Sequence, residues 1–167
     1  LTPWLPMIDA LGELPVDMLQ SLFFALDPFL GARKFRSFAR VDPDSARARE
    51  FVALEDWLND GIPLVAKVAR ECILGWYGEN TPARGEWRLR GRAVRPGAVK
   101  LPTLIVIPEQ DRIVPPASAL ALARAMPHAT QLKPPLGHIG MVVGSQAREA
   151  LWQPLSRWLD SSSGQRL

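Results

Sequence analysis

The sequence has few of the residues that mark several broad classes of protein. One cysteine in 167 residues excludes an internal disulfide and gives no sign of a secreted disulfide scaffold. No apolar run approaches the ~20 residues of a membrane-spanning helix, and Leu1-Thr2-Pro3-Trp4 resembles no part of a signal peptide. With 47% hydrophobic and 22% charged residues the chain has ordinary globular composition. Because it starts at Leu1 rather than at Met, we expect it to be the C-terminal part of a longer protein.

A nucleophile elbow is also lacking. The pentapeptides Gly-x-Ser-x-Gly and Gly-x-Cys-x-Gly, which place a catalytic hydroxyl or thiol on a sharp strand-to-helix turn, do not occur in the sequence. Cys72 lies in a stretch of helical character, and we interpret it as a small buried residue. Ser118 is expected within a helix, Ser145 at the cap of the last helix, and Ser161 to Ser163 in a polar tail. None of them is predicted to be a nucleophile.

The stretch from Leu101 to Gly140 contains the other parts of a hydrolytic site. An apolar run at 104–107 predicts a strand that is covered on both faces, and Asp111 follows it directly. An Ala- and Leu-rich helix is predicted over Ala117 to Met126, and a second strand over Thr130 to Leu132, before the Gly137-His138 turn. Loops at the carboxyl ends of parallel strands share one edge of a sheet. Asp111 and His138 are therefore expected on the same edge.

An aspartate and a histidine in this arrangement form two thirds of a catalytic triad. The carboxylate holds one ring nitrogen and fixes the tautomer, so that the other nitrogen can take a proton from a nucleophile. The order acid before histidine, 27 residues apart, is the order of α/β-hydrolases. As a structural alternative, Asp111 can serve as a turn and cap residue after the strand. His128, between Pro127 and Ala129, is expected to be a solvated loop residue.

The part of the chain before Leu101 is predicted to be mainly helical. Helices are expected over Pro15 to Leu26, Ala46 to Asn59 and about Pro63 to Tyr77, each with an apolar stripe or a clear boundary residue. Trp57 is expected to anchor the core of this region, and Asp60 to end the second helix. A helical block before the acid strand is where an α/β-hydrolase often carries a cap over its active site.

The formal net charge of +3 does not lead us to expect nucleic-acid binding. Arginines alternate with apolar residues around Gly91, a pattern that predicts a hairpin with an exposed basic face; they are Arg84, Arg88, Arg90, Arg92 and Arg95. A plain solvated face is the simpler interpretation. The phosphates of an acyl carrier such as coenzyme A would use the same charge.

Four passages together resemble the polyhydroxyalkanoate synthases, particularly the shorter class that works with a partner subunit. The cap segment at 51–60 is similar to the family's Glu-x-Trp-x-x-Asp pattern, and residues 1–4 resemble its Thr-Pro-x-Asp-Phe region. Glu109 to Pro116 resembles the family's acid loop, and Gly137 to Gly140 its histidine loop. The resemblance spans nearly the whole chain.

This resemblance implies an α/β fold, the C-terminal half of an α/β-hydrolase with parallel strands and flanking helices, preceded by a mainly helical cap. We expect a connection from the missing N-terminal half over residues 1–14, the cap over 15–85, the core with the acid and histidine loops over 86–160, and a polar tail over 161–167. It implies an acyltransferase that polymerises hydroxyacyl-CoA into polyester through a Cys-His-Asp triad. His138 would activate a thiol outside this chain, and Asp111 would orient the histidine or activate the monomer's hydroxyl.

The expected partners are hydroxyacyl-CoA, the polyester chain, a partner subunit and further copies of the protein. Coenzyme A enters only as the substrate thioester; we expect no resident cofactor, no metal and no nucleic acid. The expected location is the cytoplasm, including the surface of polyester granules. Two alternatives stay open: a fragment of a serine-dependent esterase, lipase or thioesterase of the same fold, and a non-catalytic interaction piece. The 167-residue chain alone is expected to be inactive.

Overall fold

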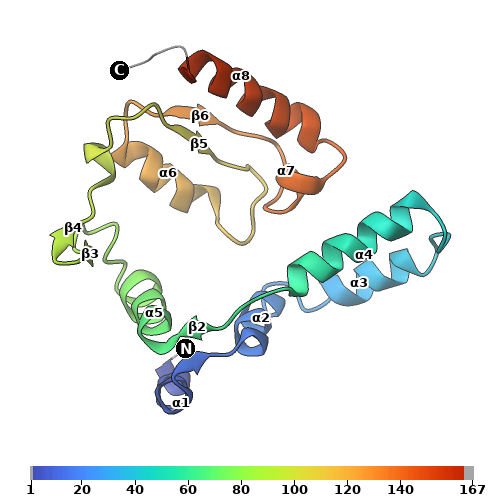
Figure 1. Cartoon of the computed structure of the whole chain (residues 1–167), viewed down its shortest axis with the longest axis horizontal. Coiled ribbons are helices and arrows are strands. Elements are labelled where there is room, and N and C mark those ends of the chain that lie inside the picture. The colour runs from blue at the N-terminus through green and yellow to red at the C-terminus, as the bar shows by residue number, and fades with distance from the viewer. Residues whose placement is uncertain (1, 164–167) are drawn as a thin grey trace. The chain divides into compact units, whose positions relative to one another are not determined.

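The computed structural model describes residues 2–163, which form two compact units (Figure 1). Within the described residues, the first unit extends to Asn80 and the second begins at Thr81. Among the described residues no helix is long and apolar enough to cross a membrane. The expected boundaries of a connection, a cap and a core stay predictions, because a division into compact units does not identify what each unit does.

The first unit is mainly helical, with one short pair of antiparallel strands. Its elements are a 3-10 turn Thr2–Trp4, α1 Leu5–Leu11, β1 Glu13–Leu14, α2 Val16–Phe24, α3 Leu30–Phe38, α4 Ala46–Asn59, β2 Leu64–Val65, α5 Ala66–Arg70 and a π-helix Glu71–Gly78 that continues α5. The strands β1 and β2 pair with Glu13 opposite Val65. The three helices expected here are present, and the bounds of α4 agree with the prediction at both ends. The predicted start of the third helix near Pro63 is wrong, because Leu64–Val65 pair with β1 as a strand and the helix begins at Ala66.

The core of the first unit joins α1 to α5. Ile8, Leu14, Ala69 and Ile73 are all buried and in contact. Half-buried Met18, Leu19 and Leu64 are among the apolar residues that pack against them. Removing this apolar surface from water contributes roughly 25 cal/mol for each Å² buried, so the cluster holds α1, β1 and α5 together.

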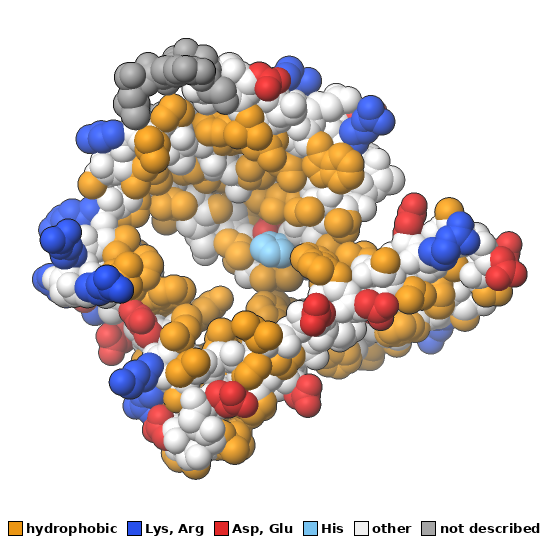
Figure 2. All heavy atoms as spheres, in the orientation of Figure 1, with side chains coloured by type: hydrophobic (Ala, Val, Ile, Leu, Met, Phe, Trp, Pro, Cys, Tyr) orange, Lys and Arg blue, Asp and Glu red, His pale blue; other side chains and the backbone are white. Residues whose placement is uncertain are grey.

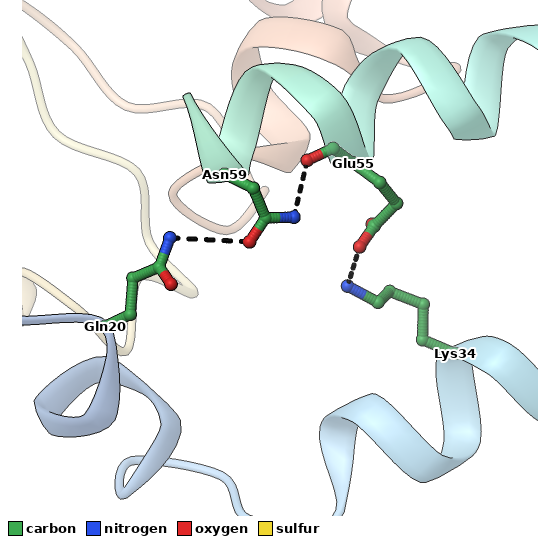
Figure 3. Close-up of polar contacts among 4 residues, drawn as sticks. All are labelled: Gln20, Lys34, Glu55 and Asn59. Carbon is green, nitrogen blue, oxygen red and sulfur yellow. Dashed lines mark hydrogen bonds and ion pairs between the residues drawn. The ribbon is translucent and has the colours of Figure 1, made fainter. Parts of the chain in front are cut away.

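Helices α3 and α4 lie against one another through aromatic and charged contacts. The Phe51 ring of α4 stacks on Phe38 at 4.1 Å between centroids. Lys34 donates to Glu55 across the same pair of helices at 2.5 Å (Figure 3). Asn59 donates to the Glu55 carbonyl and accepts from Gln20 of α2 at 3.4 Å, which links α2 to the end of α4 (Figure 3).

The expected role of Trp57 as a core anchor is wrong. Its side chain is 59% exposed, and Leu58 beside it is 39% exposed. The stripe predicted on α4 is half-buried at Phe51 and Leu54, where α3 covers it in part, and exposed at Trp57 and Leu58. An apolar spacing predicts which face a helix can bury, but it does not fix how much of that face a neighbouring helix covers. Asp60 is the residue that ends α4, as predicted.

The second unit contains a hairpin and a parallel strand pair with helices. Its elements are β3 Arg88–Leu89, β4 Arg92–Ala93, a 3-10 turn Pro96–Ala98, β5 Leu104–Val106, α6 Pro116–Ala125, β6 Thr130–Leu132, α7 Gly140–Val143, a π-helix Arg148–Trp152 and α8 Gln153–Ser163. Strands β5 and β6 are parallel, with Leu104 opposite Thr130, and run between α6 and α8 (Figure 1). The predicted hairpin, helix and two strands are confirmed. This combination of a parallel strand pair with helices is of the α/β type.

A second core lies between β5 and α6. Ile105, Ile107, Ala123 and Met126 are buried in contact with one another. Gly97 lies so close to the end of α6 that a Cβ there would come within 2.9 Å of the Ala125 carbonyl oxygen. The absence of a side chain at this position lets the 3-10 turn Pro96–Ala98 pack on the helix end.

The C-terminal helix differs from its prediction in two ways. Helix α8 extends to Ser163, so residues 161–163 are helical and not part of a tail; residues 164–167 of the predicted tail lie outside the described residues. The expected cap at Ser145 is wrong, because the helical segment begins after Ala147 without a side-chain cap. Pro154 lies inside a continuous helical run, because α8 follows the π-helix Arg148–Trp152 without a break; the π-helix lies just before this proline.

Candidate active site

The strand pair β5–β6 brings two loops side by side. Its backbone hydrogen bonds continue beyond the strands: Ile107 donates to Leu132 at 2.8 Å, Glu109 to Pro134 at 2.9 Å, and Gln110 to Leu136 at 3.1 Å. The first bond reaches the last residue of β6, and the other two each hold a residue of the loop after β5 against a residue of the loop after β6. The last bond joins Gln110, which directly precedes Asp111, to Leu136, which directly precedes Gly137-His138. The pairing of the two strands therefore continues up to the candidate site.

Asp111 is the only charged residue among the buried residues that the structure describes, with 6% of its surface exposed. Its Oδ2 lies 2.8 Å from His138 Nδ1. Its Oδ1 accepts hydrogen bonds from the backbone N–H groups of Ile113 and Val114, each at 2.8 Å. Both carboxylate oxygens therefore have partners, which compensate for the cost of removing a charge from water.

The pKa of Asp111 reflects two opposing effects. Burial raises the pKa, since it disfavours the charged form. The hydrogen bonds from Val114, His138 and Ile113 lower it, and their combined effect is larger, so the pKa lies below its ordinary value. Asp111 is consequently a carboxylate at neutral pH and accepts at both oxygens.

His138 is held through one ring nitrogen. Because an ionised carboxylate can only accept, Nδ1 carries the proton and the Nε2 lone pair is left to act as a base. Within residues 2–163 the structure shows no hydrogen bond to Nε2, and 37% of the side chain is exposed. The ring therefore has the tautomer that a general base requires, together with access from outside.

The loop after His138 is tied to the following helix. Met141 donates to the Gly137 carbonyl at 3.0 Å, which begins α7 next to the imidazole. The Trp152 indole N–H donates to the Val142 carbonyl at 2.9 Å. A Cβ at Gly144 would come within 2.5 Å of the Gly140 carbonyl oxygen, so this tight turn requires glycine. These contacts fix where the histidine loop leaves the strand.

Sequence reasoning found both side chains of the pair but missed the groups that support them. The backbone donors at Ile113 and Val114 carry no side-chain signature, although an aspartate two or three residues before such donors is typical of these turns. Trp152 could not be identified, because its partner Val142 lies ten residues away in another element. The interpretation of Asp111 as a turn residue and the triad interpretation are compatible, since one oxygen serves each purpose.

The remaining candidates lie elsewhere. His128 is exposed between α6 and β6, as predicted. Cys72 is half-buried on the π-helix of the first unit, which confirms its helical setting; burial and the neighbouring Glu71 raise the pKa of its thiol. A raised pKa disfavours the thiolate, the form that attacks. Ser118 lies in α6. None of these residues is in the Asp111–His138 hydrogen-bond network.

Comparison with known proteins identifies relatives of the whole chain. The chain is 31% identical to the poly(3-hydroxyalkanoate) polymerase subunit PhaC of Synechocystis sp. over 92% of its length. It is 28% identical to the subunit of the same name from Allochromatium vinosum over 92%, and 28% identical to that from Haloferax mediterranei over 93%. The chain is a homologue of PhaC. No protein-family model matches it, and no solved structure does.

The similarity to PhaC covers only part of those proteins. The matched region is 42% of the Synechocystis subunit, 44% of that from Allochromatium and 32% of that from Haloferax. The chain thus spans less than half the length of the PhaC relatives it matches. The resemblance that the acid, histidine and cap passages indicated is confirmed by these matches.

Proposed function

We propose that this chain supplies the acid and the histidine of an acyltransferase that polymerises hydroxyacyl-CoA into polyester. The observation that carries the proposal is the hydrogen bond between His138 Nδ1 and buried Asp111, in a chain homologous to PhaC. The first unit is proposed to act as the cap, and the second as the C-terminal half of an α/β-hydrolase fold. The nucleophile is a Cys thiol from a segment that these 167 residues do not contain.

In the proposed reaction His138 Nε2 takes the proton of the thiol. The thiolate attacks the carbonyl carbon of hydroxyacyl-CoA, the coenzyme A thiolate leaves and takes up a proton, and the acyl group remains on the cysteine as a thioester. The hydroxyl of a second acyl group then attacks a thioester carbonyl and loses its proton to a base, and the thiolate of that thioester leaves and takes up a proton. In the net reaction, one ester bond forms and one carbon–sulfur bond, the bond to coenzyme A, breaks for each monomer added.

Asp111 has one of two roles in this scheme. Its contact with Nδ1 supports the first role, in which the carboxylate orients the imidazole and stabilises the imidazolium. In the second role it activates the monomer's hydroxyl. The two roles differ in the step they affect: an orienting carboxylate is needed for acyl loading and for elongation, whereas a carboxylate that activates the hydroxyl is needed for elongation alone.

The test uses the complete protein that contains this chain. We expect His138→Ala to abolish transfer of a radiolabelled hydroxyacyl group from coenzyme A to protein, because the thiol then has no base. His128→Ala, the matched control at an exposed loop histidine, should load normally. Unchanged far-UV circular dichroism must accompany both variants. Normal loading in His138→Ala would remove this residue from the mechanism.

The same assay separates the roles of Asp111. We expect Asp111→Asn to reduce loading and elongation by a similar factor, about 10²-fold or more, since the wrong tautomer of the histidine becomes available. Normal loading with slow elongation would instead assign Asp111 to activating the hydroxyl of the monomer.

A serine in place of the thiol in the complete protein would point to a hydrolase. A partner subunit, oligomers and a cytoplasmic or granule-bound location stay predictions.

A further inference from the structure

The basic residues of the chain are concentrated in one short segment of the second unit. Six of the 20 lysines and arginines and one of the 17 acidic residues lie in residues 84–100, which gives this segment a formal charge of +5. The other 150 residues together carry −2. The six basic side chains are all exposed: Arg84, Arg88, Arg90, Arg92, Arg95 and Lys100. Figure 2 shows blue side chains gathered where Figure 1 places β3 and β4. We call residues 84–100 the basic hairpin.

The hairpin register spreads these charges around its tip. Arg88 lies opposite Ala93 and Arg92 opposite Leu89, so no two arginines of the strands are directly opposite each other. Because side chains alternate between faces, Arg88 and Arg92 point to different faces. This corrects the expectation of a single basic face. The arginine side chains are therefore distributed on both faces of the hairpin tip and do not form a single cluster.

The single acidic residue of the basic hairpin is already paired. Glu86 accepts from Arg84 through its Oε2. Among the residues that the structure describes, it gives no ion-pair partner for the other five basic residues of the segment; Arg88 donates to the Gly91 carbonyl at 3.2 Å. Five cations therefore remain available for a ligand within a small area.

The turn retains an arginine at a position that disfavours it. Arg90 has φ of 49° and Gly91 has φ of 77°, so both central residues are left-handed, as in a type I′ turn. Asn, Asp or Gly is preferred at the first of these positions, because a longer side chain on a left-handed residue is strained. Arg90 therefore places a positive charge at the tip of the hairpin although its backbone conformation is unfavourable for arginine, which points to a functional role for that charge.

We propose that the basic hairpin binds the phosphate groups at the nucleotide end of the acyl-CoA substrate. This inference rests on the proposed function and adds a second contact with the same substrate, through the end that does not react. Charges spread over a tip match a ligand with several separated phosphates better than a single phosphate ion. Coenzyme A carries a pyrophosphate and a 3′-phosphate, and arginine is well suited to phosphate oxygens.

The extent of the charged segment favours a short ligand over a long polyanion. The basic hairpin has a formal charge of +5 in 17 residues, whereas residues 101–167 of the same unit together carry only +2, so the positive charge is concentrated in one short segment and not extended as a nucleic acid would require. An anionic membrane would need an apolar anchor beside the cations, and the exposed large apolar side chains of the basic hairpin are two separate residues, Leu89 at its tip, 64% exposed, and Val99 near its end, 41% exposed. A small molecule with a few phosphates fits both observations.

The test is equilibrium binding to the full 167-residue chain, which requires no turnover. We expect coenzyme A to bind more tightly than dephospho-coenzyme A, pantetheine to bind least, and the affinity to fall with rising salt. The triple variant Arg88→Gln, Arg92→Gln, Arg95→Gln should weaken coenzyme A binding by about tenfold, because each exposed ion pair contributes modestly. The matched control Arg124→Gln, Arg148→Gln, Arg157→Gln removes the same charge from helical positions of the same unit and should change it less than twofold.

A second variant keeps the test independent of folding defects. Arg90→Asn suits the left-handed turn better than arginine, so it should raise or preserve the melting temperature and still weaken coenzyme A binding. Equal weakening by the two triple variants, no weakening by either, or no binding of coenzyme A to the unaltered chain would overturn the proposal. So would hairpin-dependent binding to phosphatidylserine vesicles without coenzyme A binding.

The outcomes for this proposal and for the proposed function are distinguishable. In the complete protein, acyl loading from a hydroxyacyl-pantetheine thioester, which has no phosphate, should be unaffected by the hairpin variants and abolished by His138→Ala. Loss of loading from pantetheine thioesters in the hairpin variants would contradict a role in phosphate binding. Failure of loading in every protein, with coenzyme A binding intact, would count against the acyltransferase and leave the phosphate site standing.

Discussion

At the scale of single residues, the site depends on how Asp111 shares its two oxygens. One oxygen accepts from two backbone N–H groups of its own loop, and the other from His138. The backbone donors hold the carboxylate even if the histidine is absent. The acid is therefore preorganised, and the histidine meets a carboxylate whose position the loop has already fixed.

The lowered pKa of Asp111 predicts a pH-dependent contribution to stability. Unfolded, the carboxyl titrates near its ordinary value of about 3.9; folded, it titrates below that, so its stabilising contribution is complete above the ordinary value and is lost as the pH falls through the folded pKa. We expect the difference in free energy of unfolding between the unaltered chain and Asp111→Asn to be constant near neutral pH and to shrink below about pH 4. Urea denaturation from about pH 7 to about pH 2.5 measures it. A difference that stays constant to the lowest pH would contradict this.

The order of residues made the pair predictable, since Asp111 and His138 each follow a predicted strand. What could not be predicted is how far the hydrogen-bond ladder extends past those strands, to Gln110 and Leu136. These hydrogen bonds are made by backbone groups, which nearly every residue has, so the residue types in the sequence do not predict them. The same holds for the backbone N–H groups that bind Asp111 Oδ1.

At the scale of elements, local sequence signals predicted where helices end, but they did not predict which side chains are buried. Helix α4 begins after Ser45, whose hydroxyl accepts from the Ala48 N–H at 3.1 Å. Serine is a preferred N-cap residue, so the start of this helix could be predicted from the sequence. The exposure of Trp57 depends on where α3 lies, and α3 itself was missed; Gly31 near its start lowers its helix propensity. The β1–β2 pair was missed too, because it joins Glu13 to Val65 across 51 intervening residues.

The cap of α4 gives a stability prediction. We expect Ser45→Ala to lower the free energy of unfolding by about 1 kcal/mol, since the Ala48 N–H then loses its partner. Ser118→Ala is the matched control, because this exposed serine lies inside α6 and alanine is the better helix former. Chemical denaturation of both variants measures the difference. Equal stability of Ser45→Ala and the unaltered chain would show that water replaces the cap without cost.

At the scale of the whole molecule, each compact unit has a core of its own. Ile8 is completely buried in the first and Ile107 is 1% exposed in the second. Truncating a buried isoleucine to alanine costs roughly 2–5 kcal/mol. We expect Ile8→Ala to reduce amide hydrogen-exchange protection in α1 and α5, and Ile107→Ala to reduce it in β5, β6 and α6. Each variant is the control for the other. Loss of protection in both units from either variant would show that the units unfold together.

The parallel pairing of β5 with β6 also has a consequence for the order of events during folding. A parallel pair cannot form through a tight turn; Leu104 meets Thr130 only after the intervening loop, with α6 inside it, has closed. Closing such a loop costs chain entropy before any contact compensates for it, which slows the pairing relative to helix formation. Asp111 and His138 meet beyond the last bonds of that pair. We therefore expect the contact between Asp111 and His138 to form late in folding, after the helices.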